Sequence, residues 1–297
     1  MNQEATGSGM DHRDRIEAAA EPIRWFHSID LGHGFVTKGF KSAEILQAEA
    51  QAILGPIDLS DRSVADIGAW NGFFSVECKR RGARRIVAVD HLVWVHPHFR
   101  GRESIELVRD ALGVDIELDQ RDIADTSVAT IGEHDVILLL GVFYHLFDVQ
   151  TDLRRISQCA RDLLILETHQ DAFDRIEPAM IFYPGDTLNN DASNWWGPNP
   201  QLVHVLLKEF GFEKIYYRPH PVHGHLRGVY HAFRTAGART RYDVSLEAGG
   251  SIDLDTLVAP RGRDGRVRGP FPWTPPAKPA VRNIRNFFRF ITKRSIG

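Results

Sequence analysis

The chain has 297 residues, of which 43% are hydrophobic and 25% are charged, so it can bury one full α/β core and leave room for attachments. Only two cysteines occur, which excludes a disulfide framework and a cysteine-based zinc site, and we expect Cys78 and Cys159 to be core thiols. No segment reaches the roughly 18 consecutive apolar residues of a membrane span. The first residues hold no apolar run of signal-peptide length, and the sequence therefore predicts a cytoplasmic protein.

The formal net charge of -3 is unevenly distributed along the chain. From Arg261 onward there are ten basic residues and a single acidic one, a net charge of +9, so residues 1–260 carry -12. An acidic body repels polyanions such as nucleic acid unless a local basic groove overrides it, whereas the basic tail attracts them.

The N-terminal part of the chain is expected to be a flexible polar leader over residues 1–22 and a cap over residues 23–60. Aromatic residues and flexible glycines mix between Ile23 and Gly39, and a helix is expected from about Ser42 to Leu54. Such a segment is typical of a cap that packs on a larger domain.

Strands and helices alternate regularly after the cap. This alternation predicts an α/β fold with a Rossmann-like, doubly wound sheet of seven strands, the last two joined as a hairpin. The strands are expected at 63–67, 85–90, 114–118, 134–140, 162–167, 213–218 and 228–235, and the helices at 72–81, 103–112, 149–161 and 201–210.

The first strand runs into a glycine-containing turn. Glycines let the backbone approach a bound nucleotide-like cofactor closely, but the G-x-G-x-x-G spacing of dinucleotide sites is missing, and an acidic residue in the turn suits a cation better than a pyrophosphate. The turn resembles motif I of class I S-adenosylmethionine-dependent methyltransferases, usually D-x-G-x-G-x-G. The residues that carry this resemblance, with alanine and asparagine as departures, are Asp66, Gly68, Ala69, Asn71 and Gly72.

Acidic residues follow the second and third strands, in the order that such a cofactor site requires. Asp90 ends the second strand and is expected to accept hydrogen bonds from the ribose hydroxyls, with His91 beside it. Asp122 and Ile123 follow the third strand and are expected to bind the adenine ring or its amino group. The fold implied is that of a class I methyltransferase, with its domain over residues 23–236.

The fourth strand leads into Leu140-Gly141-Val142-Phe143-Tyr144-His145-Leu146-Phe147-Asp148. This stretch resembles the bacterial methyltransferases related to the tRNA wobble-uridine carboxymethyltransferase, over residues 25–235. The resemblance implies that Leu140 lines the cofactor and that Tyr144 and Arg227 touch the carboxylate of carboxy-S-adenosylmethionine. The N-terminal lysine and the basic, tryptophan-rich stretch of that subfamily have no convincing equivalent here. A carboxylated cofactor needs a clamp of cationic residues around its carboxylate, and only half of such a clamp remains here. We therefore expect S-adenosylmethionine, with the carboxylated form as the alternative.

An irregular insert over residues 168–198 follows a strand whose end faces the cofactor crevice, and it is expected to form a lid over the acceptor. Asn194, Trp195 and Trp196 suit a ring or sugar face, and together with Tyr144 and Arg227 they are the predicted substrate-binding residues. A general base helps methyl transfer only when the acceptor is protonated. The candidates are His145 first, then Glu167 and His169.

Four histidines lie close together at positions 220, 223, 225 and 231. They invite a metal interpretation, but a carboxylate partner is missing locally and His-x-His in a Pro-Gly loop is nonspecific. We therefore predict no metal.

The C-terminal part is expected to be a Pro- and Gly-rich linker over 237–280 and a basic amphipathic helix over 281–297. Five apolar residues of this helix fall on one face: Val281, Ile284, Phe287, Phe288 and Ile291. This pattern suits a helix docked on its own domain or on a second subunit of an oligomer, a peripheral membrane helix, or a nucleic-acid-binding tail.

Together these features predict a methyltransferase that acts on oxygen or nitrogen of a small molecule, such as a sugar, a glycan precursor or a secondary metabolite. Nucleic acid is not the favoured partner, because the body is acidic and the clamp incomplete. Two alternatives stay open: a tRNA wobble-uridine modifying enzyme that uses the basic tail, and a non-catalytic binding module built on the cofactor fold. Ala69 in place of the usual glycine is the hint of the latter.

Overall fold

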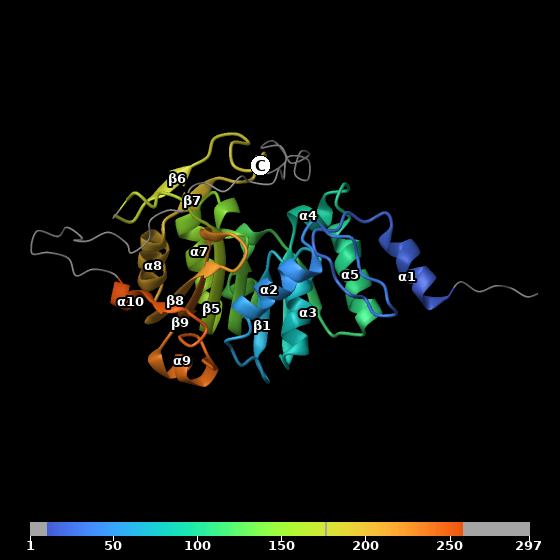
Figure 1. Cartoon of the computed structure of the whole chain (residues 1–297), viewed down its shortest axis with the longest axis horizontal. Helices are drawn as coiled ribbons and strands as arrows, with labels where there is room; N and C mark the ends of the chain where they lie inside the picture. The colour runs from blue at the N-terminus through green and yellow to red at the C-terminus, as the bar shows by residue number, and fades with distance from the viewer. Residues whose placement is uncertain (1–10, 176, 258–297) are drawn as a thin grey trace, which may run out of the picture.

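The computed structural model describes residues 11–175 and 177–257, and its centre is a mixed sheet with strand order β10-β8-β9-β5-β4-β1-β2-β3 (Figure 1). Strands β1 to β5 are parallel, whereas β9 runs antiparallel to β5 and β8, and β10 antiparallel to β8. The strands are β1 Ser63–Ile67, β2 Arg85–Asp90, β3 Glu117–Gln120, β4 His134–Leu140, β5 Ala160–His169, β8 Lys214–His220, β9 Gly224–Phe233 and β10 Ile252–Asp253.

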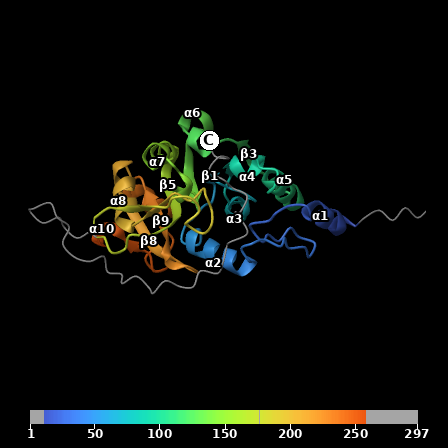
Figure 2. The ribbon, with the colours of Figure 1, turned by 90° about the horizontal axis from the view of Figure 1, so that it is seen from above.

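Two apolar cores cover the two faces of this sheet, and side-chain alternation along each strand divides residues between them. In β4, Val136 and Leu138 face one core, and Ile137 and Leu139 face the other. Figure 2 shows α2 and α7 on opposite sides of the sheet. The helices are α1 His12–Ala20, α2 Ala43–Ile53, α3 Phe73–Arg80, α4 Leu92–Val95, α5 Gly101–Leu112, α6 Val128–Ile131, α7 Val149–Gln158, α8 Pro200–Glu209, α9 Ala236–Tyr242 and α10 Leu254–Leu257, with short 3₁₀ turns η1 Ile123–Asp125 and η2 Phe143–His145.

The predicted Rossmann-like architecture is confirmed, but within the described residues the sheet has eight strands rather than seven. The additional strand, β10, is two residues long and pairs with Tyr216 and Tyr217 of β8. A strand this short has no periodicity to read, and it lies in the segment expected to be a linker.

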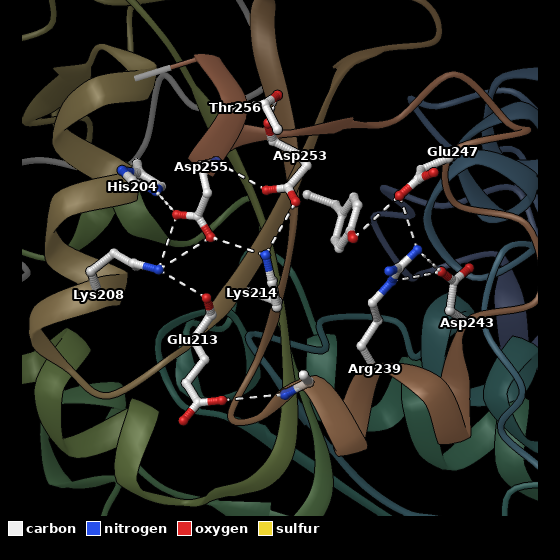
Figure 3. Close-up of polar contacts among 12 residues, drawn as sticks. His204, Lys208, Glu213, Lys214, Arg239, Asp243, Glu247, Asp253, Asp255 and Thr256 are labelled. Carbon is white, nitrogen blue, oxygen red and sulfur yellow. Dashed lines mark hydrogen bonds and ion pairs between the residues drawn. The ribbon is translucent and has the colours of Figure 1, made fainter. Parts of the chain in front are cut away.

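Residues 237–257, the described part of that expected linker, pack against the sheet. Leu246 and Leu254 are fully buried, and Figure 3 shows the polar contacts that hold the segment. Asp255 accepts hydrogen bonds from His204 and Lys208 of α8, and Glu247 accepts one from Arg239 of α9. The compact domain therefore extends beyond residue 236. The rest of the linker and the expected C-terminal helix lie outside the described residues.

The boundaries of several elements also differ from expectation. Strand β3 begins at Glu117, three residues later than the apolar run suggests, and β9 begins at Gly224, so that His225 and Arg227 belong to a strand. Helix α1 lies inside the expected leader and packs beside α5 (Figure 1). Cys78 and Cys159 are buried free thiols, as predicted. Over the described ranges, no helix combines the length and apolarity needed to cross a membrane.

Two attachments cover the carboxyl ends of the central strands. Of the cap expected over residues 23–60, only residues 23–41 form such an attachment, called the cap below, because α2 packs on a face of the sheet. Isolated bridges join His27 to Lys41 and Asp30 to Val36 within it. The lid contains a two-stranded sheet formed by β6 Met180–Phe182 and β7 Trp196–Pro198, at the upper edge of the molecule in Figure 1.

Candidate functional site

The candidate site lies at the carboxyl ends of β1, β2 and β4. Strand β1 lies between β2 and β4, and the chain leaves β1 toward β2 on one side and reaches β4 by a longer route on the other. The crevice outside such a switch point is where open α/β sheets bind their ligands.

The turn from β1 to α3 requires glycine at two positions. Gly68 has a φ of +81°, and a Cβ built there would lie 2.4 Å from Cγ2 of Val142. Gly72 has a φ of +80° and precedes the first residue of α3, with Ile105 against it. Trp70 between them adopts a left-handed conformation and Ala69 is buried, so the whole turn is tightly folded against the sheet.

Two carboxylates flank this turn, and both are buried. Asp90 accepts a hydrogen bond of 3.0 Å from the Trp70 amide, and burial raises its pKa to about 7. Asp66 accepts a 2.6 Å hydrogen bond from the Ser75 hydroxyl, and burial raises its pKa to about 6. Asp66 thus ties β1 to α3.

The Asn71 side chain is bonded entirely within the protein. Its Oδ1 accepts from the amides of Phe26 and His27 at 2.9 and 3.1 Å, and its Nδ2 donates to the Ser104 hydroxyl at 2.7 Å. Asn71 is fully buried and joins the cap, the turn and α5. Asn71, which departs from the methyltransferase motif, therefore stabilises the structure by linking these three segments.

Among the other residues expected to line the cofactor, the structure brings His91 close to Asp122. Nδ1 of His91 lies 3.8 Å from a carboxylate oxygen of Asp122, and both side chains are exposed. Ile123 and Leu140, at the ends of β3 and β4, are half-buried. These four side chains lie at or just after the ends of β2, β3 and β4, and their contact with a cofactor stays a prediction.

A buried ion pair lies between β5 and β9. Arg227 donates to both carboxylate oxygens of Glu167, with an Nη2–Oε2 distance of 2.8 Å, and to the hydroxyl of Tyr144 at 3.3 Å. Burial alone would raise the pKa of Glu167, but the charge and hydrogen bonds of Arg227 hold it below its ordinary value. Burial raises the pKa of Tyr144. The charge of Arg227 is thus matched within the protein.

The other two candidate bases contact the lid. Nδ1 of His145 lies 3.0 Å from both the carbonyl oxygen and the hydroxyl of Ser193. Nε2 of His169 lies 3.3 Å from the hydroxyl of Tyr183, which donates to Asp171. Burial lowers the pKa of both histidines, to about 4 for His169. Both rings are therefore neutral near pH 7.

The predicted lid residues differ in their surroundings. Asn194 is buried and donates to the Leu188 carbonyl at 2.9 Å, so it shapes the lid internally. Trp195 is half-buried, and its amide donates to the Tyr144 carbonyl at 2.8 Å, which joins the lid to the end of β4. Trp196 is also half-buried and donates from Nε1 to the Phe147 carbonyl.

The histidine-rich hairpin has no carboxylate partner nearby in the sequence, but the fold supplies one from a distant element. Ligand atoms of Glu49, His220 and His223 lie within 4.8 Å of one another. Glu49 comes from α2, so sequence proximity gives no sign of it. However, the Lys41 ammonium bonds both Glu49 oxygens at 2.8 Å, and His220 Nδ1 accepts from two backbone amides. The His220 proton is then on Nε2, facing Glu49, and the cluster is a closed network. The absence of a metal stays a prediction.

The chain matches no protein-family model, and it matches no curated protein. Solved structures do resemble it. EvdMO1 is 18% identical with a TM-score of 0.53, over 78% of this chain and 50% of EvdMO1, so the chain spans half the length of that relative. The N-terminal domain of EvdMO1, crystallised with SAH and D-fucose, is 17% identical with a TM-score of 0.54, over 75% of this chain and 96% of the domain.

A putative S-adenosylmethionine-dependent methyltransferase from Listeria monocytogenes is 12% identical with a TM-score of 0.50, over 64% of this chain and 99% of that protein. Nothing in these matches links the chain to the tRNA wobble-uridine subfamily. Identities this low establish the fold alone. The chain has the Rossmann-like fold of the class I S-adenosylmethionine-dependent methyltransferases.

Proposed function

We propose that this protein is a methyltransferase that transfers a methyl group from S-adenosylmethionine to an oxygen or nitrogen atom of a small molecule. The observation that carries the proposal is the turn between β1 and α3, where Gly68 has no space for a side chain and the Trp70 amide is bound to the buried Asp90. A close-approach turn beside a strand-end acid suits a nucleotide-like cofactor. The likeness in fold to the SAH-bound EvdMO1 domain supports it.

In this proposal Asp90 accepts from the ribose hydroxyls, and the backbone of the turn contacts the rest of the cofactor. Bound there, S-adenosylmethionine supplies an electrophilic methyl group. Asp66 and Asn71 shape the turn, because their side chains bond Ser75 and the cap. The residues proposed to line the cofactor are Gly68, Ala69, Gly72, Asp90, His91, Asp122, Ile123, Leu140 and Tyr144.

The acceptor is proposed to lie between the cofactor crevice and the lid. Trp195 and Trp196 are half-buried aromatic residues of the lid, and aromatic side chains of this kind suit a sugar, a glycan precursor or a secondary metabolite. The D-fucose in the EvdMO1 domain crystal supports the sugar class. Among the candidate bases His145 is preferred, since both oxygens of Glu167 are bound by Arg227.

The same ion pair bears on the choice of cofactor. A carboxylated cofactor needs a cation that is not already neutralised. Here Arg227 forms an ion pair with Glu167, and Lys41 forms one with Glu49. Burying a further carboxylate beside these pairs would cost desolvation without a new partner charge. Plain S-adenosylmethionine is therefore the proposed cofactor.

The proposal is tested by isothermal titration calorimetry of the full chain with S-adenosylmethionine and with its carboxylated analogue. We expect binding of the first, weaker binding of the second, and a loss of ~1–3 kcal/mol for the first in Asp90→Ala. Asp115→Ala, which removes an exposed carboxylate, should bind like the wild type. No binding of S-adenosylmethionine would favour the non-catalytic module, and preference for the analogue would return the chain to the carboxymethyl-transferring subfamily.

A further inference from the structure

The lid contacts His145 through a short polar chain. The Ser193 hydroxyl lies 3.0 Å from His145 Nδ1 and donates a 2.6 Å hydrogen bond to Oδ1 of Asp191. The Ser193 carbonyl lies 3.0 Å from the same Nδ1. Asp191 and Ser193 are almost fully buried, so this chain is shielded from bulk water.

The protons in this hydrogen-bond network of His145, Ser193 and Asp191 can be assigned by counting donors. A serine hydroxyl has one proton, and Ser193 gives it to Asp191, since a carboxylate only accepts. The Ser193 carbonyl also only accepts. Nδ1 of His145 faces two acceptors and must therefore carry the ring proton. In the neutral ring Nε2 then holds the lone pair, and it has no hydrogen-bond partner within residues 11–175 and 177–257.

The segment of the lid that carries Asp191 and Ser193, residues 188–193, is ordered by its own contacts. Asp191 Oδ1 also accepts from the Ser193 amide at 2.9 Å, and the Asp191 amide donates to the Leu188 carbonyl. Asn189 and Asn190, at φ of 60° and 55°, supply the left-handed conformation that asparagine tolerates best after glycine. The lid thus holds Asp191 and Ser193 in place before any ligand arrives.

We propose that Asp191 and Ser193 are positioning residues that hold His145 with its proton on Nδ1, so that Nε2 serves as the general base for the acceptor. This inference rests on the proposed methyltransferase function. As the acceptor oxygen or nitrogen bonds the methyl carbon, its proton passes to Nε2, and the electrons of the broken carbon–sulfur bond stay on sulfur. The lid therefore both covers the acceptor and orients the base.

Two charges act on the His145 ring from neighbouring elements. Asp191 of the lid favours its protonated form, and Arg227 of β9, itself paired with Glu167 and bonded to Tyr144, opposes it. Burial is the largest influence and lowers the pKa, which keeps Nε2 unprotonated near pH 7. Removal of the Asp191 charge should lower this pKa further.

The test is nitrogen-15 NMR of the full chain labelled at histidine, with the His145 signals assigned by their loss in His145→Gln. In the wild type we expect the chemical shifts of a ring protonated at Nδ1. Asp191→Asn, which keeps an acceptor oxygen but no charge, should lower the His145 pKa by about one unit. Asp186→Asn removes an exposed charge from the same lid and should leave that pKa unchanged.

A wild-type ring protonated at Nε2 would overturn the proposal, and this measurement needs no variant that might fail to fold. An equal effect of the two aspartate variants would overturn it as well. Calorimetry with S-adenosylmethionine on the same samples separates this inference from the proposed function. If the wild type fails to bind, the function is wrong whatever the ring shows; if it binds and the ring is protonated at Nε2, only the positioning role is wrong.

Discussion

Asp90, which we propose to bind the cofactor ribose, opposes folding when it is ionised. Its carboxylate is buried at the end of β2, where it accepts from the Trp70 amide, and burial raises its pKa to about 7 from an ordinary 3.8. A carboxyl group whose pKa is raised by folding stabilises the fold most below its unfolded pKa, and that contribution is lost as the pH rises through the folded pKa. Above pH 7 the ionised Asp90 side chain therefore lowers the free energy of unfolding of the protein without ligand.

We therefore expect Asp90→Asn to become more stable relative to the wild type as the pH rises from 4 to 7. Asn cannot ionise but keeps an oxygen that accepts from the Trp70 amide. A pKa raised from 3.8 to about 7 corresponds to a gain that approaches ~4 kcal/mol at pH 8. Urea unfolding without ligand at pH 5, 6.5 and 8 measures it. Asp115→Asn, at an exposed position, should differ from the wild type equally at each pH. A pH-independent difference for Asp90→Asn would mean that Asp90 titrates as an ordinary carboxyl group.

At the scale of elements, the cap and the turn between β1 and α3 form one unit. Asn71 bonds the amides of Phe26 and His27, and the Phe26 ring stacks on Trp70 with centroids 4.5 Å apart. On its other side Asn71 holds α5 through Ser104. Three segments distant in sequence thus share one buried amide, so the shape of the turn depends on the docking of the cap.

We expect Asn71→Ala to lower the free energy of unfolding by ~2–4 kcal/mol, because it leaves two buried backbone amides without acceptors. Ser104→Ala removes the bond from Asn71 Nδ2 and the bond to the Gly101 carbonyl but leaves both cap amides paired, and it should cost less, ~1–2 kcal/mol. Urea unfolding gives both values, and hydrogen exchange should be faster at Phe26 and His27 in the first variant. Equal costs for the two variants would contradict the role assigned to Asn71.

For the whole molecule, the contacts in Figure 3 place the end of the compact domain well after the last long strand. Asp255 bonds His204 and Lys208, and Lys214 lies 3.4 Å from Asp253. Burial alone would raise the pKa of Asp255, but its bonds to Lys208 and His204 hold that pKa below its ordinary value. The segment thus belongs to the fold both by apolar burial and by charge.

A chain that ends at residue 257 should therefore keep its stability and its affinity for S-adenosylmethionine. A chain that ends at residue 242 loses the burial of Leu246 and Leu254, at roughly 3–6 kcal/mol, and should be strongly destabilised. Thermal unfolding and calorimetry compare the two with the full chain.

The chain that ends at residue 257 also tests the basic tail, because it lacks every residue of the net +9 segment. We expect it to alter oligomeric state or association with anionic liposomes without affecting cofactor binding. Loss of cofactor binding in the chain that ends at residue 257 would show that the tail belongs to the core.

The sequence by itself determined the doubly wound sheet and the order of its turns. These depend on local patterns: apolar runs of strand length, helical periodicity, and glycines such as Gly68 and Gly72 where the backbone is left-handed. Because parallel strands end at one edge, the positions of Asp90, Asp122 and Tyr144 along the chain also indicated that they would gather there. The two-residue β10 and the late start of β3 are too short or too weakly patterned to be predicted.

Only the tertiary structure decided how the side chains pair. Arg227 meets Glu167 across 60 residues, Ser193 meets His145 across 48, and Asn71 meets Phe26 across 45. No local pattern encodes such pairs, since they depend on where the lid and cap dock on the sheet. That docking depends on packing and on the pairing of buried polar groups. As a result, Arg227 is a neutralised cation rather than a free one, and Asn71, expected to contact a ligand, links the turn to the cap.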